Sequence, residues 1–223
     1  MAGKGKYYES QFEEATIELL RESHWQYTFG DDIHRKYTDP LIEEDLRTFL
    51  AAQYKDKKLT ASEVDGIVAN LRNTGGQNDY YALQNTFLLY RDGYDFTYSD
   101  GRGNPFRLQY IDFEHPDHNI FRCVNQFVME QGRENRRPDI LLFVNGIPVC
   151  IIELKNPTKQ NATIRDAHTQ ICTRYMRDIP ALLKYCALAV ISDGAKNELG
   201  TTYTPFEFFY EWKKIDKIGR ASC

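Results

Sequence analysis

The sequence predicts an α/β (α+β) fold, in which a mixed β-sheet is flanked by helices and preceded by a helical N-terminal region. Helical periodicity dominates the first hundred residues, and β-rich runs dominate the part that follows. Within that second part, a strand, a helical stretch and an apolar strand follow one another, an order that produces a sheet covered by helices. We therefore expect a helical region at residues 1–105, packed on a β-rich core at residues 106–223.

Four helices are expected in the N-terminal region. Three segments carry apolar residues at the spacing of an amphipathic helix. The third of them follows Thr60, a good N-cap, and stops at Gly75-Gly76. The fourth segment has an ambiguous pattern, which we assign to a helix. The four expected helices are residues 9–22, 41–54, 61–73 and 78–89.

Strands are expected next. Alternating apolar residues predict strands at 108–113 and 119–129. Two β-rich runs, 139–144 and 149–154, then surround Asn145-Gly146, a pair typical of a two-residue hairpin turn.

Two helices and one buried strand complete the expected core. Residues 161–178 have the pattern of a helix, which must end before Pro180. Residues 185–192 are apolar almost throughout, as in a strand that is covered on both faces. Residues 206–215 have the pattern of a final helix.

Composition excludes several classes of protein. The 223 residues are 42% hydrophobic and 27% charged with a net charge of −4, so a strongly basic coat for nucleic acid is absent. No apolar run reaches the roughly 18 residues of a membrane span. The N-terminus carries no apolar signal segment, so we expect a cytoplasmic protein. The cysteines form no Cys-x-x-Cys pair, which argues against a disulfide scaffold.

Residues of the expected hairpin carry the predicted chemistry. Asp139 starts its first strand, and Glu153-Leu154-Lys155 lie near the end of the second. Alternate side chains of a strand share a face, so Glu153 and Lys155 point together while Leu154 points into the core. Two carboxylates with the Leu154 carbonyl make an all-oxygen site suited to Mg²⁺, with Mn²⁺ as a second candidate. Such a metal polarises a phosphodiester, and Lys155 would orient the attacking water or offset charge on phosphorus. The alternative is a surface acid beside a solvated strand end.

The hairpin register tests this assignment. A strict two-residue turn would place Glu153 on the face opposite to Asp139, because side chains alternate with a period of two. We therefore predict a three-residue loop or a β-bulge within the hairpin, with Pro148 as a suitable position for the break.

Several motifs in this half of the chain occur together in one known family. They are Arg137-Pro138-Asp139-Ile140, Asn145-Gly146-Ile147-Pro148 and Ile151-Ile152-Glu153-Leu154-Lys155-Asn156-Pro157, with Asn125-Gln126-Phe127 upstream and Ile191-Ser192-Asp193-Gly194 downstream. Through them the chain resembles the N-terminal nuclease domain of the restriction (R) subunit of type I restriction-modification enzymes, in the PD-(D/E)xK superfamily. The resemblance is specific over about residues 108–212. It implies a restriction-endonuclease-like fold, with Asp139 and Glu153 as metal ligands and Lys155 as the catalytic lysine.

The resemblance also implies a function. The chain would be a Mg²⁺-dependent endonuclease domain that hydrolyses double-stranded DNA without reading sequence, while specificity and modification (methyltransferase) subunits supply recognition and methylation. In this family an ATP-driven motor lies in the same polypeptide, and its Gly-x-x-x-x-Gly-Lys-Ser/Thr motif is absent here, so we expect a fragment of a longer protein. The alternatives are a DNA-binding module that is silent in isolation, and a nuclease of DNA repair or junction resolution.

Supporting residues are expected around this centre. The family tends to place a Gln and a Tyr four residues apart on the helix after the hairpin, whereas Gln170 and Tyr175 are five apart here. On a regular α-helix those two would not share a face, but Gln170 and Arg174 would. Tyr175 is therefore equally compatible with a core position. Glu13 could lend a carboxylate from the first helix, although an exposed helix face is favoured. The expected DNA contacts are Arg136, Arg137, Lys159 and Arg165.

One further cluster could bind a metal. His115-x-x-His118 follows Asp112, and these residue types are ligands of transition metals. Because Pro116 lies between the two histidines, they are not expected on one helix turn. The sequence therefore favours a loop with solvated acids.

Overall fold

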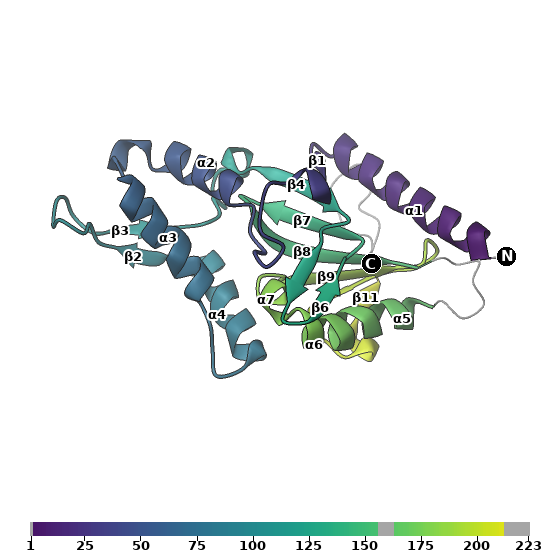
Figure 1. Cartoon of the computed structure of the whole chain (residues 1–223). Helices are drawn as coiled ribbons and strands as arrows, with labels where there is room; N and C mark the ends of the chain where they lie inside the picture. The colour runs from purple at the N-terminus through teal and green to yellow at the C-terminus, as the bar shows by residue number, and fades with distance from the viewer. Residues whose placement is uncertain (1, 156–162, 212–223) are drawn as a thin grey trace.

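A mixed β-sheet forms the centre of the molecule (Figure 1). The computed structural model describes residues 2–155 and 163–211, and within these ranges the sheet has seven strands in the order β1-β4-β7-β8-β9-β10-β11. The pairs β1–β4 and β8–β9 are parallel, and the other neighbours are antiparallel. The strands are β1 (Gln26–Phe29), β4 (Phe121–Asn125), β7 (Ile140–Val144), β8 (Ile147–Leu154), β9 (Leu188–Ser192), β10 (Asn197–Gly200) and β11 (Tyr210–Glu211).

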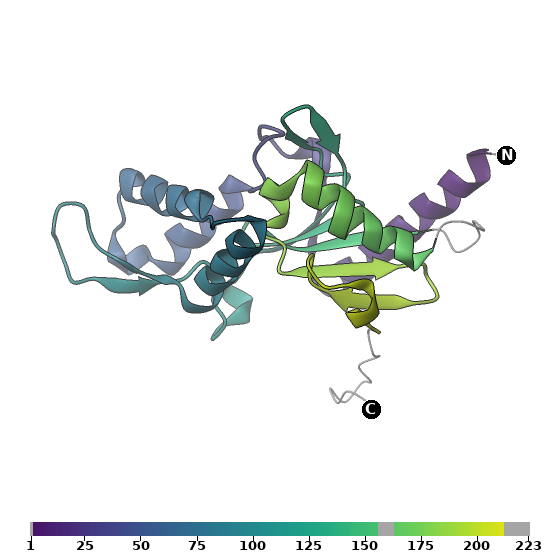
Figure 2. The ribbon, with the colours of Figure 1, turned by 90° about the horizontal axis from the view of Figure 1, so that it is seen from below.

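Helices cover both faces of this sheet (Figures 1 and 2). On one face, Ile17 of α1 (Ala2–Glu22) packs with Ile152 and other residues of β8. On the other face, Ile151 packs with the helical segment that follows the hairpin. That segment comprises α5 (Ile164–Thr169), a π-helical turn (Gln170–Tyr175), α6 (Met176–Asp178) and α7 (Pro180–Leu183). Strand β8 carries apolar residues on both faces of the sheet, because helices cover both faces. This agrees with the helix-flanked sheet that the sequence predicts.

A helical part with its own apolar cluster adjoins the turn end of the β7–β8 hairpin. It is built from α2 (Glu43–Gln53), α3 (Ala61–Asn73), α4 (Asp79–Asp92) and a small hairpin of β2 (Tyr94–Phe96) and β3 (Phe106–Leu108). The largest buried side chains of the cluster include Phe49, Tyr110 from the segment after β3 and Tyr185 from the segment before β9. The cluster reaches Val144 and Ile147 at the ends of the hairpin strands. Strand β1, also from the first hundred residues, is part of the central sheet.

The expected helices of the first region are confirmed. Thr60 caps α3 through a capping box, in which its side chain accepts a hydrogen bond from Glu63 N at 3.2 Å. The Asn78 side chain caps the start of α4, and Gly93, with a φ of +64°, is the C-cap that follows its last residue. Helix α1 begins earlier than expected, and the others differ from expectation by no more than three residues.

Three expected elements are wrong or incomplete. Strand β3 ends at Leu108, and the predicted strand at 108–113 is instead a loop in which Asp112 N donates to the Asn119 side chain. The predicted strand at 119–129 breaks at Gln126, whose φ of +55° is left-handed, and the chain then enters a separate hairpin of β5 (Met129–Gln131) and β6 (Glu134–Arg136).

The predicted helix at 206–215 is also wrong over its described part. Residues Phe206–Phe208 form one 3₁₀ turn, and β11 then pairs with β10 at the sheet edge. Two aromatic residues of this segment pack on His168, with ring centroids 5.5 Å away for Phe206 and 5.0 Å away for Phe209.

The β7–β8 hairpin contains the predicted β-bulge. Asn145 and Gly146 form a two-residue turn with φ values of +52° and +75°, the left-handed pair that such a turn requires. Val144 pairs with Ile147 and Phe143 with Pro148, but Leu142 pairs with Cys150, so Val149 is the extra residue. Beyond the bulge the register brings Asp139 and Glu153 to the same face of the sheet.

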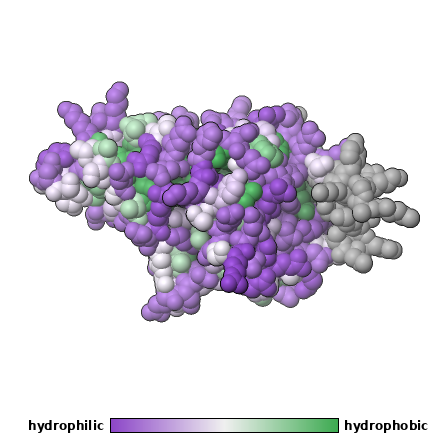
Figure 3. All heavy atoms as spheres, in the orientation of Figure 1, coloured by the Kyte–Doolittle hydropathy of each residue, from purple (hydrophilic) through white to green (hydrophobic). Residues whose placement is uncertain are grey.

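Polar side chains predominate on the face of the molecule shown in Figure 3. No helix within residues 2–155 and 163–211 combines the length and the apolar character that a membrane span requires.

Candidate active site

Two acids of the β7–β8 hairpin meet in a small cavity beside the sheet. Asp139 directly precedes β7, and its Oδ2 accepts a hydrogen bond of 2.7 Å from the main-chain N–H of Leu154. Glu153 lies in β8 with only 1% of its surface exposed. The cavity has a volume of about 230 Å³ and is lined by Glu13, Asp139, Glu153, Leu154, Lys155 and Gln170. Three carboxylates and a lysine therefore face one space.

Lys155 is fixed on both sides of its ammonium group. Its Nζ donates to Glu153 Oε1 at 2.8 Å and to Gln170 Oε1 at 2.9 Å. Leu154 points into the apolar cluster under α1, as the alternation along the strand predicts. A lysine ammonium has three donors, and the described residues take up two of them.

Gln170 and Tyr175 both reach Glu153, which corrects the expectation that they lie on different faces. The Gln170 amide donates to Glu153 Oε1 and, over 2.7 Å, to the Tyr175 hydroxyl. That hydroxyl lies 3.3 Å from Glu153 Oε2. The segment between them is a π-helical turn, in which residues five apart are neighbours along the helix. The π-helical turn therefore brings together a Gln and a Tyr that are five residues apart, whereas the family tends to place them four apart.

Glu13 reaches the cavity from α1. Its carboxylate accepts hydrogen bonds from the side-chain amides of Asn125 at 2.7 Å and Gln126 at 3.0 Å, and Tyr27 in turn donates to Asn125. Glu13 is thus held in place rather than lying on the exposed helix face that was favoured. Sequence reasoning gave no role to Tyr27, Asn125 or Gln126, although Asn125-Gln126-Phe127 was among the motifs of the resemblance.

Burial and mutual repulsion oppose ionisation of the two central carboxyls. Desolvation and the nearby Asp139 raise the pKa of Glu153 to about 8, against the opposing effect of Lys155. Desolvation also raises the pKa of Asp139, although the Leu154 N–H and Lys155 lower it. A divalent cation would relieve this repulsion, and oxygen donors are its preferred ligands. The residues present therefore fit a divalent metal ion held by Asp139 and Glu153.

The other expected residues lie in different surroundings. Arg137 is exposed and lines an adjoining cleft with Glu13 and Asp139. Arg136 is engaged by Asp178, with Nε 2.7 Å from Oδ2, and by Glu134. The Arg165 guanidinium lies 4.2 Å from the centroid of the Phe206 ring. Arg174 is exposed and does not line the cavity, and Lys159 lies outside the described residues.

The mixed sheet, its helical layers and the paired acids define a restriction-endonuclease-like α/β protein. Residues 6–208 match the model of one protein family, described as the type I restriction enzyme R protein N terminus. The chain belongs to this family, as the resemblance implies.

Named relatives agree with the family. The chain is 30% identical over 224 residues to the type I restriction enzyme HindI endonuclease subunit of Haemophilus influenzae, a match that covers 96% of this chain and 21% of the relative. It is 33% identical over 132 residues to the EcoprrI endonuclease subunit of Escherichia coli, covering 55% and 40% of the two chains. It is 24% identical over 184 residues to the SsaAORF53P endonuclease subunit of Staphylococcus saprophyticus, covering 78% and 18%. The chain thus spans about a fifth of the length of the Haemophilus relative.

Proposed function

We propose that this chain is the Mg²⁺-dependent endonuclease domain of a type I restriction-modification enzyme, and that it hydrolyses phosphodiester bonds of double-stranded DNA without sequence readout of its own. The observation that carries the proposal is the convergence of Asp139, Glu153 and Lys155 on one cavity. The β-bulge at Val149 creates this convergence, because without it the two acids would lie on opposite faces. The names of the relatives as endonuclease subunits support the same activity.

Each residue of the cavity receives a role in this proposal. Asp139, Glu153 and the Leu154 carbonyl would hold Mg²⁺, with Mn²⁺ as a substitute; the ion supplies Lewis-acid polarisation of the phosphate and a more acidic bound water. Lys155 would orient the nucleophilic water or offset charge on the phosphate oxygens. Gln170 and Tyr175 orient the Glu153 carboxylate through the hydrogen bonds described above. Glu13 adds a carboxylate at the edge of the cavity.

DNA would approach over the cleft beside this cavity. Arg137 lines that cleft, and Arg165 is exposed on α5, so both are proposed phosphate contacts together with Lys159. Arg136 is already engaged by two acids and would contribute less. By the same proposal, separate specificity and modification subunits supply sequence recognition and methylation, and ATP acts through a motor region that these residues do not contain. Residues 106–223 would form the nuclease core, with the helical region 1–105 packed on it.

Nicking of supercoiled plasmid tests the proposal. We expect nicking with Mg²⁺ or Mn²⁺, no nicking with EDTA, and loss of nicking in Lys155→Ala. Lys196→Ala is the matched control, because Lys196 is an exposed lysine in the β9–β10 turn. Nicking by Lys155→Ala at the wild-type rate would contradict the assigned centre.

A silent wild-type chain would have a different meaning. The same pair of variants would then be compared in the full-length subunit with its partner subunits and ATP. Retained cleavage by Lys155→Ala in that complex would reject the proposal. Preference of the isolated chain for branched DNA over linear duplex would favour a repair nuclease instead.

A further inference from the structure

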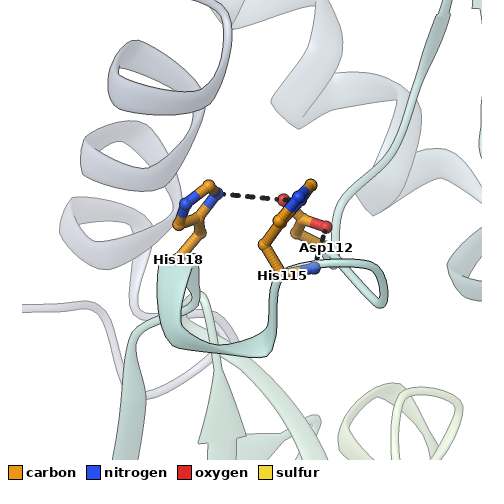
Figure 4. Close-up of side chains that lie close together, drawn as sticks. All are labelled: Asp112, His115 and His118. Carbon is orange, nitrogen blue, oxygen red and sulfur yellow. Dashed lines mark hydrogen bonds and ion pairs between the residues drawn. The ribbon is translucent and has the colours of Figure 1, made fainter.

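A second cluster of metal-binding residue types lies in the loop that connects β3 to β4, at a site separate from the residues that line the candidate active site. Its members are Asp112, His115 and His118. In Figure 4 both imidazole rings and the carboxylate stand together on the same side of this loop. One potential ligand atom from each residue lies within 4.8 Å of the other two.

The local backbone creates this arrangement. Pro116–His118 form a 3₁₀ turn with His115 at its N-cap, and residues three apart are eclipsed in such a turn. The two imidazole rings are consequently stacked, with centroids 4.9 Å apart and planes inclined by 18°. The proline that argued against a shared α-helical turn therefore starts the 3₁₀ turn that brings the histidines together.

Asp112 is not a solvated acid, contrary to the expectation from the sequence. It is 5% exposed, and its Oδ1 accepts hydrogen bonds from the main-chain N–H groups of Glu114 at 3.0 Å and His115 at 2.9 Å. Its Oδ2 accepts from the side chain of Gln53 at 2.9 Å. A carboxylate anchored in this way has a fixed direction before any ligand arrives, as a metal ligand supported by neighbouring hydrogen bonds should.

The distances fit a tetrahedral ion. Asp112 Oδ2 lies 3.2 Å from His118 Nδ1 and 3.5 Å from His115 Nδ1. Ligands placed at zinc bond lengths around a tetrahedral ion are about 3.3 Å apart. The ligand atoms of the two histidines lie within 4.8 Å of each other, and their side chains are 59% and 51% exposed, which leaves them free to rotate toward a common ion. We propose that Asp112, His115 and His118 form a binding site for a first-row transition-metal ion such as Zn²⁺, with water as the fourth ligand.

Two imidazoles and one carboxylate select the metal. Imidazole nitrogen suits Zn²⁺ and its first-row neighbours, whereas Mg²⁺ prefers oxygen. The proposed site therefore differs in chemistry from the all-oxygen centre at Asp139 and Glu153, and its occupation does not depend on the proposed nuclease function.

The site would join three parts of the fold. Gln53 belongs to α2, and Asp112 N donates to Asn119 Oδ1 at 2.9 Å. The same Asn119 oxygen accepts from Asn145 Nδ2 at 2.8 Å, and Asn145 forms the turn of the β7–β8 hairpin. A bound ion would thus stabilise the connection between the helical part and the hairpin that carries Glu153. Because a ligand that binds only the folded chain stabilises it, the ion should raise the unfolding temperature.

Binding of Zn²⁺ and Co²⁺ to the whole chain tests the proposal. The titration uses the double variant Asp139→Asn/Glu153→Gln, so that the carboxylate centre contributes little. We expect about one equivalent of Zn²⁺ by calorimetry, a tetrahedral visible spectrum with Co²⁺, and a higher unfolding temperature with Zn²⁺ but not with Mg²⁺. His115→Ala and His118→Ala, each added to that background, should weaken binding at least tenfold and remove the spectrum.

The controls separate this site from other ligands. His34→Ala in the same background is the matched control, because it removes another exposed histidine, and it should bind as the parent does. His115 and His118 are exposed enough for both alanine variants to fold, which circular dichroism verifies. The proposal is overturned if the double variant binds no Zn²⁺. It is also overturned if His115→Ala and His118→Ala, each added to that variant, leave Zn²⁺ binding unchanged.

Discussion

Gln170 donates a hydrogen bond of 2.7 Å to the hydroxyl of Tyr175, five residues further along the chain, and both side chains contact the carboxylate of Glu153. Residues five apart on an α-helix diverge, so this contact depends on the π-helical turn between them. Through this turn, the helical segment that covers the sheet is connected to the carboxylate of Glu153 in β8.

Removing the Tyr175 hydroxyl should slow cleavage. Hydrogen bonds to charged groups contribute roughly 1.5–3 kcal/mol, so loss of this orientation in the transition state would slow nicking by about 10- to 100-fold in Tyr175→Phe. Single-turnover nicking measures the effect. The control is Tyr203→Phe, which removes a buried hydroxyl that has no hydrogen-bond partner among the described residues. Equal rates for the two variants would show that the Tyr175 contact does not serve catalysis.

Glu13 should affect the metal requirement rather than the fold. Its carboxylate lies in the same cavity as Asp139 and Glu153, fixed by two side-chain amides. We expect Glu13→Ala to raise the Mg²⁺ concentration for half-maximal nicking by roughly tenfold, the usual scale for supporting residues of a metal site. Glu14→Ala is the control, because Glu14 is the next residue in the chain and its side chain is exposed. An unchanged Mg²⁺ dependence in Glu13→Ala would remove Glu13 from the site.

The central hairpin could be predicted from the sequence in detail. Asn145-Gly146 specifies its turn, and the need to bring Asp139 and Glu153 to one face requires the bulge that is found at Val149. Three of the helices in the first region were predictable because long apolar periodicity and a strong N-cap leave few alternatives.

Other features depend on contacts that no local pattern encodes. The π-helical turn accompanies contacts of Gln170 and Tyr175 with Glu153 in β8, which local periodicity does not encode. The four-residue strand β1 exists through its parallel pairing with β4, and the two-residue strand β11 through pairing with β10. Gln126 leaves the sheet in a left-handed conformation, which binary patterning does not reveal.

Replacing Gly146 should destabilise the hairpin far more than replacing a comparable glycine elsewhere. A Cβ at Gly146, where φ is +75°, would lie 2.1 Å from the main-chain oxygen of Ile42. Left-handed strain and the clash together should cost about 3 kcal/mol or more in Gly146→Ala. Gly132→Ala is the control, with a φ of +62° and no heavy atom within 4 Å, and should cost only about 1–2 kcal/mol. Urea unfolding compares them, and equal losses would contradict the close packing of the turn on α2.

Stability without metal should fall as the pH rises, and Glu153 should cause much of that fall. Its pKa is raised from 4.5 to about 8, so the folded chain binds more protons than the unfolded chain between these values. The free energy of unfolding must then decrease with rising pH in this window and level off above pH 8. A glutamine at this position does not ionise, so Glu153→Gln should remove a pH-dependent change in the free energy of unfolding on the order of a few kcal/mol. Urea unfolding in EDTA at several pH values measures it, with the exposed Glu14→Gln as the control. A wild-type slope that persists in Glu153→Gln would show that Glu153 ionises normally in the folded chain.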